Sequence, residues 1–173
     1  GYIEYGMTPA LGATAQDMRG AGYSGETHYV QIAGLPENQT YYFDIVSGST
    51  RDDNQGNHYV VTTGPTLPPS TPDTIYGQVF RSDGTTPAVG AIVRFEVWNA
   101  NGGGSSGISS LLSALVDSSG YWYSNLGAAR LGDLSGFYTY STSGDLLEVN
   151  IQGGSHGDAC KFYDTANDAP ASN

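Results

Sequence analysis

Three histidines and a short run of carboxylates and amides are the residues with which this chain could do chemistry. The histidines are His28, His58 and His156. A zinc site needs three or four converging ligands, and the chain contains no His-x-His, His-Glu-x-x-His or Cys-x-x-Cys motif. The run 102–107 is interpreted as a flexible glycine and serine loop. We identify no Gly-x-Ser-x-Gly nucleophile elbow, so serine hydrolase chemistry has no support in the sequence. We therefore expect surface or cross-strand histidines, no enzymatic activity and no cofactor.

A polar tip is the strongest candidate for a metal site. Asp52, Asp53, Asn54 and Asn57 offer oxygen atoms of the kind that Ca²⁺ accepts. Their spacing is not that of an EF-hand loop, which needs ligands at alternate positions and a glutamate at the twelfth. A solvated hairpin tip is the preferred interpretation, and Ca²⁺ is the weaker alternative.

Glycans are a candidate partner but not the preferred interpretation. Asn38-Gln39-Thr40 is an N-glycosylation sequon on an expected exposed turn, so Asn38 is a candidate acceptor. The alternative is that Thr40 only suits the turn. Tyrosine-rich runs at 121–123 and 138–140 offer rings that could stack on sugars, although sandwich core and rim is the preferred interpretation.

Composition excludes several classes of protein. The 173 residues include 6 Lys+Arg and 17 Asp+Glu, a net charge of -11, which argues against binding a nucleic-acid backbone. The longest apolar runs are far shorter than the ~20 residues needed to span a bilayer. A single cysteine, Cys160, excludes an intrachain disulfide. We expect it to be a small buried side chain, with an intermolecular bridge as the alternative.

Alternating apolar residues around a Gly34-Leu35-Pro36 turn predict two strands of a half-buried antiparallel sheet. Val30 and Ile32 precede the turn. After it, Tyr42, Asp44 and Val46 alternate with Tyr41, Phe43 and Ile45. Further strands are expected at residues 2–6, 58–63, 75–80, 89–97, 111–116, 137–140, 146–151 and 159–164. With 25 Gly, 13 Tyr and 8 Pro, this pattern indicates an all-β protein.

Residues 1–64 resemble a known family in two places. The Tyr5-Gly6 and Thr8-Pro9 pattern, and the Gly-Leu-Pro turn followed by residues 40–43, are similar to fibronectin type III domains. They are also similar to the non-catalytic N-terminal accessory domain of purple acid phosphatases. The resemblance implies an immunoglobulin-like sandwich whose first strands are missing here, because these motifs normally come late in the domain. The metal-ligand motifs of the phosphatases are absent from the sequence, so no phosphatase activity is implied.

A proline-rich stretch, residues 65–73, predicts a stiff linker before a second module. From residue 74 the order Gly77-x-Val79, Asp83-Gly84, Pro87, Gly90-Ala91-x-Val93 and then residues 117–122 resembles the carboxypeptidase regulatory-like, transthyretin-like β-sandwich. The resemblance implies a complete sandwich over residues 74–166, followed by a polar tail over 167–173. The expected architecture is two tandem immunoglobulin-like β-sandwiches, the first incomplete.

These expectations lead to a function hypothesis. A sandwich without its first strands exposes an unpaired edge, which a strand from another copy can fill. Head-to-tail repetition of such a contact gives an open filament. We therefore expect a structural subunit of an extracellular, pilus-like filament that has copies of itself as partners. Its candidate acceptor residues are Val30, Ile32, Tyr42 and Asp44, and its intersubunit candidate is Cys160.

The competing hypothesis is a non-catalytic accessory or sugar-binding module of a larger secreted enzyme or surface adhesin. In that case the missing strands would lie upstream in the same polypeptide. The chain begins at Gly1 and not at Met, so we expect a mature or trimmed product of a protein at the cell surface or outside the cell.

Overall fold

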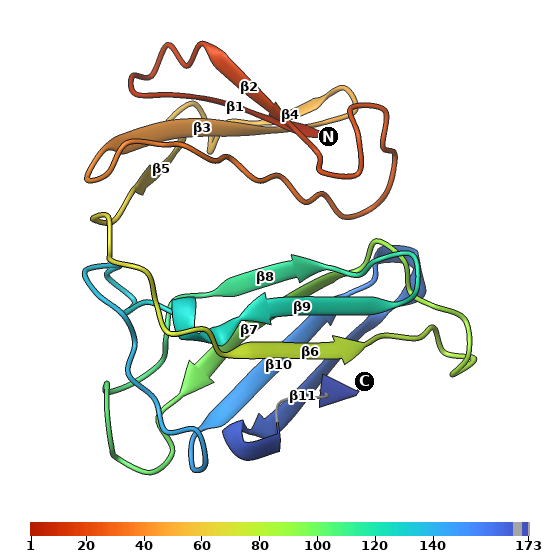
Figure 1. Ribbon diagram of the computed structural model, residues 1–173. Helices are drawn as coiled ribbons and strands as arrows, with labels where there is room; N and C mark the ends of the chain where they lie inside the picture. Colours follow the sequence, from red (N-terminus) through yellow and green to blue (C-terminus); the bar gives the residue numbers. More distant parts are fainter. Residues whose placement is uncertain (168–170, 173) are drawn as a thin grey trace. The chain divides into compact units, whose positions relative to one another are not determined.

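The computed structural model describes residues 1–167 and 171–172, and it divides the chain into two compact units, Gly1–Thr66 and Leu67–Asn173. Both units consist of β-sheets (Figure 1), so the predicted all-β class is confirmed. The described helical segments are single 3₁₀ turns, namely η1 (Leu126–Ala128), η2 (Gly154–His156) and η3 (Thr165–Asn167). None of the described residues belongs to a helix long and apolar enough to cross a membrane.

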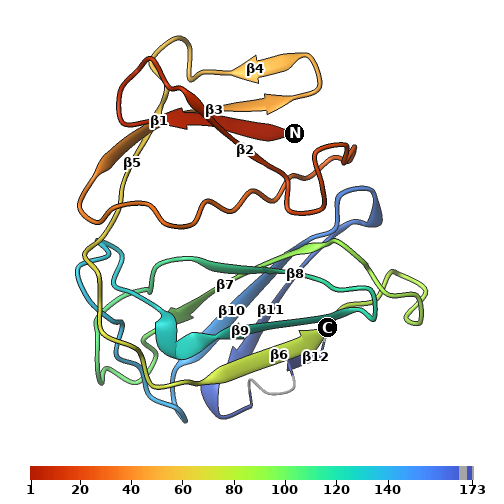
Figure 2. The same cartoon turned by 45° about the horizontal axis from the view of Figure 1, so that its top comes forward.

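The first unit is built on one sheet with β3 at its centre (Figures 1 and 2). Its strands are β1 (Tyr2–Gly6), β2 (Ala13–Gln16), β3 (Thr40–Ser47), β4 (Thr50–Asp52) and β5 (Tyr59–Thr62). β1 pairs along one edge of β3 and in turn pairs with β2, whereas β4 and β5 share the other edge of β3. The aromatic and β-branched run in β3 favours an extended backbone. A two-residue loop with Gly48 at φ 60° joins β3 to β4.

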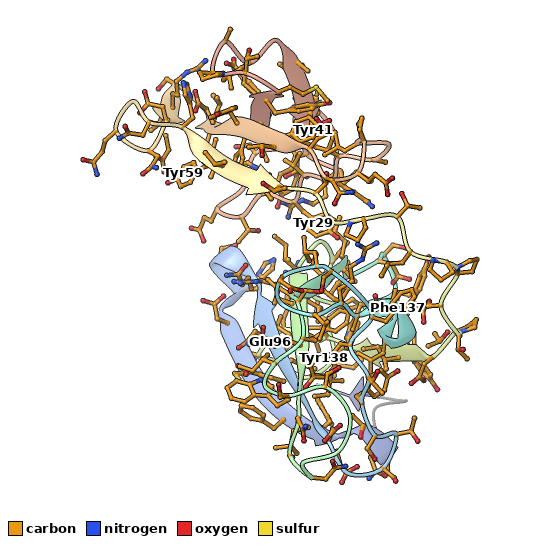
Figure 3. The ribbon with its side chains drawn as sticks, turned by 90° about the vertical axis from the view of Figure 1, so that its left-hand side faces the viewer. Tyr29, Tyr41, Tyr59, Glu96, Phe137 and Tyr138 are labelled. Atoms are coloured by element: carbon orange, nitrogen blue, oxygen red, sulfur yellow. The ribbon has the colours of Figure 1, made fainter. Side chains whose placement is uncertain are left out.

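The register sorts the side chains of this sheet into two faces. One face is mainly apolar and carries Ile3, Tyr5, Tyr41, Phe43, Ile45, Tyr59 and Val61. The opposite face carries Tyr2, Glu4, Tyr42, Asp44, Val46 and Val60. Among the described residues of this unit, Tyr41 and Val46 are the buried hydrophobic ones (Figure 3 labels Tyr41). A sheet normally buries one face against a second layer. The first unit has one sheet among its described residues, so its hydrophobic core is small.

The strand predicted at residues 28–35 is wrong. Only Val30 makes a bridge, to Asp17, and the segment otherwise runs back along the sheet without a ladder (Figures 1 and 2). The reason is a competing side chain, because the carboxylate of Asp17 accepts the backbone N–H of Tyr29. Farther along, Thr63 Oγ1 donates to the carbonyl of Pro36 and so anchors the turn.

The second unit consists of two facing sheets with a shared core. The four-stranded sheet has the order β11 (Asp158–Asp164), β10 (Leu146–Gln152), β7 (Ile92–Trp98) and β8 (Leu112–Leu115). The three-stranded sheet has the order β12 (Ala171–Ser172), β6 (Thr74–Gln78) and β9 (Tyr121–Asn125). All neighbours are antiparallel except β12, which runs parallel to the end of β6. The predicted tail thus contains β12, and its residues 168–170 and 173 lie outside the described residues.

The core of the second unit lies between these two sheets. Trp122 of β9 and Phe95 of β7 are fully buried, with ring centroids 5.5 Å apart. The inward positions of the strands are Ile75, Val93, Val97, Leu147, Val149 and Ile151. Period-two alternation therefore places one apolar face of each sheet inside, as expected for a half-buried strand.

A tight turn before β9 explains part of the predicted motif. Asp117 Oδ1 accepts the backbone N–H groups of Ser119 and Tyr121, at 2.8 and 2.9 Å. Gly120 adopts φ 86°, and a Cβ at this position would lie 3.1 Å from Pro87. Both facts favour glycine here, because other residues are strained at this φ.

The strand predicted at residues 137–140 is also wrong. Phe137 makes a single bridge to Arg130, and the backbone N–H of Tyr138 donates to the carbonyl of Ala129 at 2.9 Å. The Tyr138 hydroxyl donates to the carbonyl of Gly107 at 2.7 Å (Figure 3 labels Phe137 and Tyr138). The aromatic side chain of Tyr138 packs in the core and its hydroxyl binds a loop carbonyl, so the aromatic pattern of this segment does not reflect strand pairing.

Candidate functional site

A buried carboxylate, Asp17, organises the loop that follows β2 in the first unit. It accepts hydrogen bonds from Arg19 Nε at 2.9 Å and Nη2 at 2.8 Å, and from the backbone N–H groups of Arg19 and Tyr29. His28 Nδ1 lies 3.2 Å from the same carboxylate. The Arg19 guanidinium also lies 3.7 Å from the centroid of the Tyr23 ring. The buried charge is therefore paired and saturated with hydrogen bonds, as a buried ion must be.

A second buried carboxylate, Asp44 of β3, lies opposite Glu4 on one face of the first unit's sheet. Its two oxygens contact His58 Nδ1 and Arg51 Nη1, each at 2.7 Å, and Arg51 Nη2 also donates to Glu4. The side chain of Asp44 is 1% exposed. Glu4, Arg51 and His58 border a surface hollow of about 450 Å³. In the first unit, the buried residues therefore include the carboxylates Asp17 and Asp44 as well as the hydrophobic side chains Tyr41 and Val46.

Both clusters hold the pKa of their carboxyl groups down. Burial acts to raise the pKa of Asp17, but hydrogen bonds from Arg19, Tyr29 and His28 outweigh it, and the pKa lies well below its usual range. Burial likewise acts to raise the pKa of Asp44, and His58 and Arg51 together lower it.

We expect the first unit to lose stability in acid. A depressed folded-state pKa contributes stability that is complete above the unfolded value, 3.8 for aspartate, and is lost as the pH falls below it. Hydrogen-exchange protection factors of residues 1–66 should therefore drop between about pH 4 and pH 2. The variant Asp44→Asn leaves the partly exposed Arg51 paired with Glu4 and should show a flatter pH dependence. Equal protection of wild-type residues 1–66 at pH 6 and pH 2 would contradict this expectation.

The Asp17 cluster also has the connectivity of a serine-hydrolase relay. His28 Nε2 lies 3.0 Å from the hydroxyl of Ser47, and both residues line a hollow of about 390 Å³. In such a relay the carboxylate stabilises the imidazolium formed when histidine takes the serine proton. Here the Arg19 guanidinium already offsets the charge of Asp17. We therefore interpret the arrangement as structural: His28 connects the loop that follows β2 to the end of β3 by hydrogen bonds.

A pair of carboxylates that sequence reasoning did not single out is assembled by strand register. Glu96 of β7 and Glu148 of β10 lie directly opposite each other on the outer face of the four-stranded sheet (Figure 3 labels Glu96). Partial burial raises the pKa of Glu96, and the charge of Glu148 raises it further. Only the pairing of two distant strands brings these residues together, so no local motif could have revealed them.

The open edge of the second unit is β11. Among the described residues it pairs only with β10. Two backbone hydrogen bonds, Thr165 N to Asp145 O and Gly153 N to Gly157 O, lie at the two ends of the β10–β11 ladder. They show which residue pairs of the ladder are hydrogen-bonded and which are not. In an antiparallel pair, the positions between such bonded pairs turn their N–H and C=O groups outward. Those outward positions of β11 are Asp158, Cys160, Phe162 and Asp164.

The inner side of β11 is also incompletely covered. Ala159 is exposed, although it occupies the same face of the sheet as the core residue Ile151. Ala159 and Ile151 line a hollow of about 240 Å³ with Val79, Phe80 and Ala88, and the charged residues Arg81, Asp158 and Lys161 also border it. The two sheets are therefore open on the side of β6 and β11, where β12 makes only two residues of pairing. An added strand would find an edge to pair with and a mainly apolar hollow beside it.

The first unit has an open edge of its own at β5, which pairs only with β3 among the described residues. The bond from Thr63 N to Gln39 O sets the alternation and turns the backbone groups of Val60 and Thr62 outward. Val60 is 57% exposed and Val61 is 46% exposed. β5 is short, at four residues, but it carries neither proline nor charge, and its exposed β-branched residues leave the edge able to pair with another strand.

The structure separates the four residues predicted to accept a partner strand. Val30 makes only the bridge to Asp17, and Ile32 lies outside any strand. Tyr42 and Asp44 do share one face of β3. Both edges of β3 are already occupied, by β1 and by β4 with β5, so its backbone has no position for an added strand. Pairing positions exist on β5 and β11 instead.

The remaining candidate residues lie at the surface. Cys160 is exposed on β11, so the expectation of a buried thiol is wrong, and its accessibility fits the alternative of an intersubunit position. Asn38 is exposed in a turn at φ 54°, where an N-glycan has access. His156 is exposed in η2.

The polar tip predicted as a weak Ca²⁺ site uses its oxygens for its own turn. Asp52 accepts from the backbone N–H of Asn54 and from the Tyr59 hydroxyl, and Asp53 accepts from the backbone N–H of Gly56. Within residues 1–167 and 171–172, no group of three or more His, Cys, Asp or Glu side chains could hold a metal ion. The letters Gly-x-Ser-x-Gly do occur at 103–107, but these residues form a loop without the helix that follows the serine in a nucleophile elbow.

Comparison with known proteins places this chain in no family. No family model, no curated protein and no solved structure matches it. Functional inference therefore rests on the geometry of the two units.

Proposed function

We propose that this chain is a structural subunit of an extracellular filament whose copies join head-to-tail by β-strand pairing. The observation that carries the proposal is the open edge of β11, a seven-residue strand with outward backbone groups beside a mainly apolar hollow. Proteins normally protect such edges with proline, bulges, charged side chains or covering segments. β11 has no proline, and its charged residues are Asp158 and Asp164 at its two ends and Lys161 between them. Among the described residues no segment pairs with its outer edge, and an edge of this length is a template for another strand.

The partner strand that we assign to β11 is β5 of a second copy. β5 lies in the other unit of the chain and carries Val60 and Val61, which water penalises when they are exposed. It has no charged residue that would oppose pairing. Because β5 and β11 are different surfaces, their contact is heterologous, and repetition leads to an open filament if the rotation does not close a ring. The fibronectin-like and transthyretin-like resemblances are compatible with such tandem modules in surface proteins.

A proline at position 162 is expected to abolish fibres without unfolding the protein. The N–H of Phe162 points outward, so Phe162→Pro removes a donor from the open edge while the ladder to β10 stays intact. The matched control is Phe162→Ala, which removes the 57% exposed ring but keeps the N–H. Electron microscopy should show uniform fibres for the wild type and for Phe162→Ala, and monomers for Phe162→Pro. Thermal melting should change little in both variants.

Two results would overturn the proposal. Monodisperse wild-type monomers at high concentration would favour a non-catalytic module of a larger secreted protein. Fibres of Phe162→Pro indistinguishable from wild type would show that β11 is not the contact.

A further inference from the structure

Three exposed tyrosines form a corner-shaped cluster on the outer face of the three-stranded sheet. Tyr76 of β6 and Tyr123 of β9 are directly opposite in the ladder, and Tyr121 lies two residues before Tyr123. Their exposed fractions are 40%, 74% and 45% for Tyr76, Tyr123 and Tyr121. The residues between them, including Trp122, point inward to the core. The tyrosines are therefore not sandwich core, and the fold holds them on a rigid surface.

This tyrosine face, defined as residues 74, 76 and 78 of β6 and 121, 123 and 125 of β9, has no charged side chain. The other three members are Thr74, Gln78 and Asn125. The whole chain has a net charge of -11. On the outer face of the four-stranded sheet, by contrast, Arg94, Glu96 and Glu148 are among the outward residues. A charge-free aromatic surface on so acidic a protein is suited to a neutral ligand.

The chemistry of the face favours a sugar chain over a purely apolar ligand. A tyrosine presents an apolar ring and a polar hydroxyl, and so suits ligands that are apolar on one side and wet on the other. Neighbouring strands lie about 4.8 Å apart and alternate residues of one strand about 7 Å apart, in perpendicular directions. The three rings therefore form a compact platform on which adjacent sugar rings of one chain can stack. The Gln78 side chain donates to the carbonyl of Ser119 at 3.2 Å, which holds its amide beside Tyr121.

We propose that the tyrosine face binds a neutral polysaccharide by stacking of sugar rings on Tyr76, Tyr121 and Tyr123. The site lies on the sheet opposite to β11, and it does not depend on the proposed polymerisation. A filament with this face repeated along its length would bind such a polymer at many points, which multiplies its apparent affinity.

The test measures binding of the full chain to cellohexaose, xylohexaose and mannohexaose by calorimetry. At least one of them should bind, and Tyr123→Ala and Tyr121→Ala should each weaken binding at least about tenfold, as loss of a stacking ring does. Phe162→Ala is the matched control, because it removes an aromatic ring of similar exposure from the other sheet. It should bind like the wild type, and the near-ultraviolet spectrum of buried Trp122 should report an intact core in every variant.

Several outcomes would overturn the inference. Absence of wild-type binding to all three oligosaccharides, or unchanged affinity of Tyr123→Ala, would exclude a stacking site. Equal losses in Tyr123→Ala and Phe162→Ala would exclude specificity for this face. A change of sedimentation in Tyr123→Ala without any sugar dependence would reassign the face to contacts between copies. The sugar-binding results are independent of whether the wild type forms fibres.

Discussion

Replacement of Trp122 with alanine is expected to lower the free energy of unfolding of the second unit by about 3–5 kcal/mol. Trp122 is fully buried between the two sheets and packs on Phe95. Its loss would leave a large cavity in a core that the facing strands cannot fill, because both sheets are fixed by their ladders. Chemical denaturation of the full chain, with hydrogen exchange of residues 74–164 to identify the unit, measures the effect.

Two further substitutions make this expectation specific. Tyr123→Ala changes the next residue of the same strand, which is 74% exposed, and should cost less than about 1 kcal/mol. Trp122→Phe should cost much less than Trp122→Ala. The indole Nε1 is buried without a hydrogen-bond partner among the described residues, and removing an unsatisfied donor offsets part of the lost packing. A cost for Trp122→Ala below about 1.5 kcal/mol would contradict the proposed core.

Replacement of Asp17 with alanine is expected to destabilise the first unit by about 3–5 kcal/mol, enough to unfold it while the second unit remains intact. The substitution leaves the Arg19 guanidinium, which is 11% exposed, without its carboxylate. It also removes the acceptor of two backbone N–H groups that fix residues 17–29. The first unit has little apolar burial with which to absorb the loss, since Tyr41 and Val46 are its buried hydrophobic residues among those described.

Hydrogen exchange resolved by unit is the measurement for Asp17→Ala. Protection of residues 2–6 and 40–47 should be lost, whereas protection of β7 and β10 should be retained. Glu26→Gln is the control, because Glu26 is an exposed carboxylate of the same loop and its change should stay within about 0.5 kcal/mol. Uniform loss of protection over both units would show that the chain unfolds as one body. Wild-type protection in Asp17→Ala would show that the buried ion pair is dispensable.

Local signals predicted most strands because a strand's period and its turn residues are properties of the chain itself. β3 was readable from an aromatic and β-branched run, and the turn before β9 from Asp117 and Gly120. The same signals failed at residues 28–35 and 137–140. In these segments the residues bind the Asp17 carboxylate and a loop carbonyl in place of a neighbouring strand. An alternation of apolar and polar residues does not determine which group will accept a backbone N–H.

The candidate sites depended far more on tertiary structure. The sequence by itself determined an acidic, single-cysteine, all-β chain with a proline-rich stretch near its first third, because composition and local pattern suffice for these conclusions. Only the tertiary structure decided that β3 is central, that β5 and β11 are edges, and that Tyr76 faces outward beside Tyr123. The physical reason is that edge position, sheet face and the partners of Asp17 and Asp44 arise from pairing between distant segments, which no local window of sequence contains.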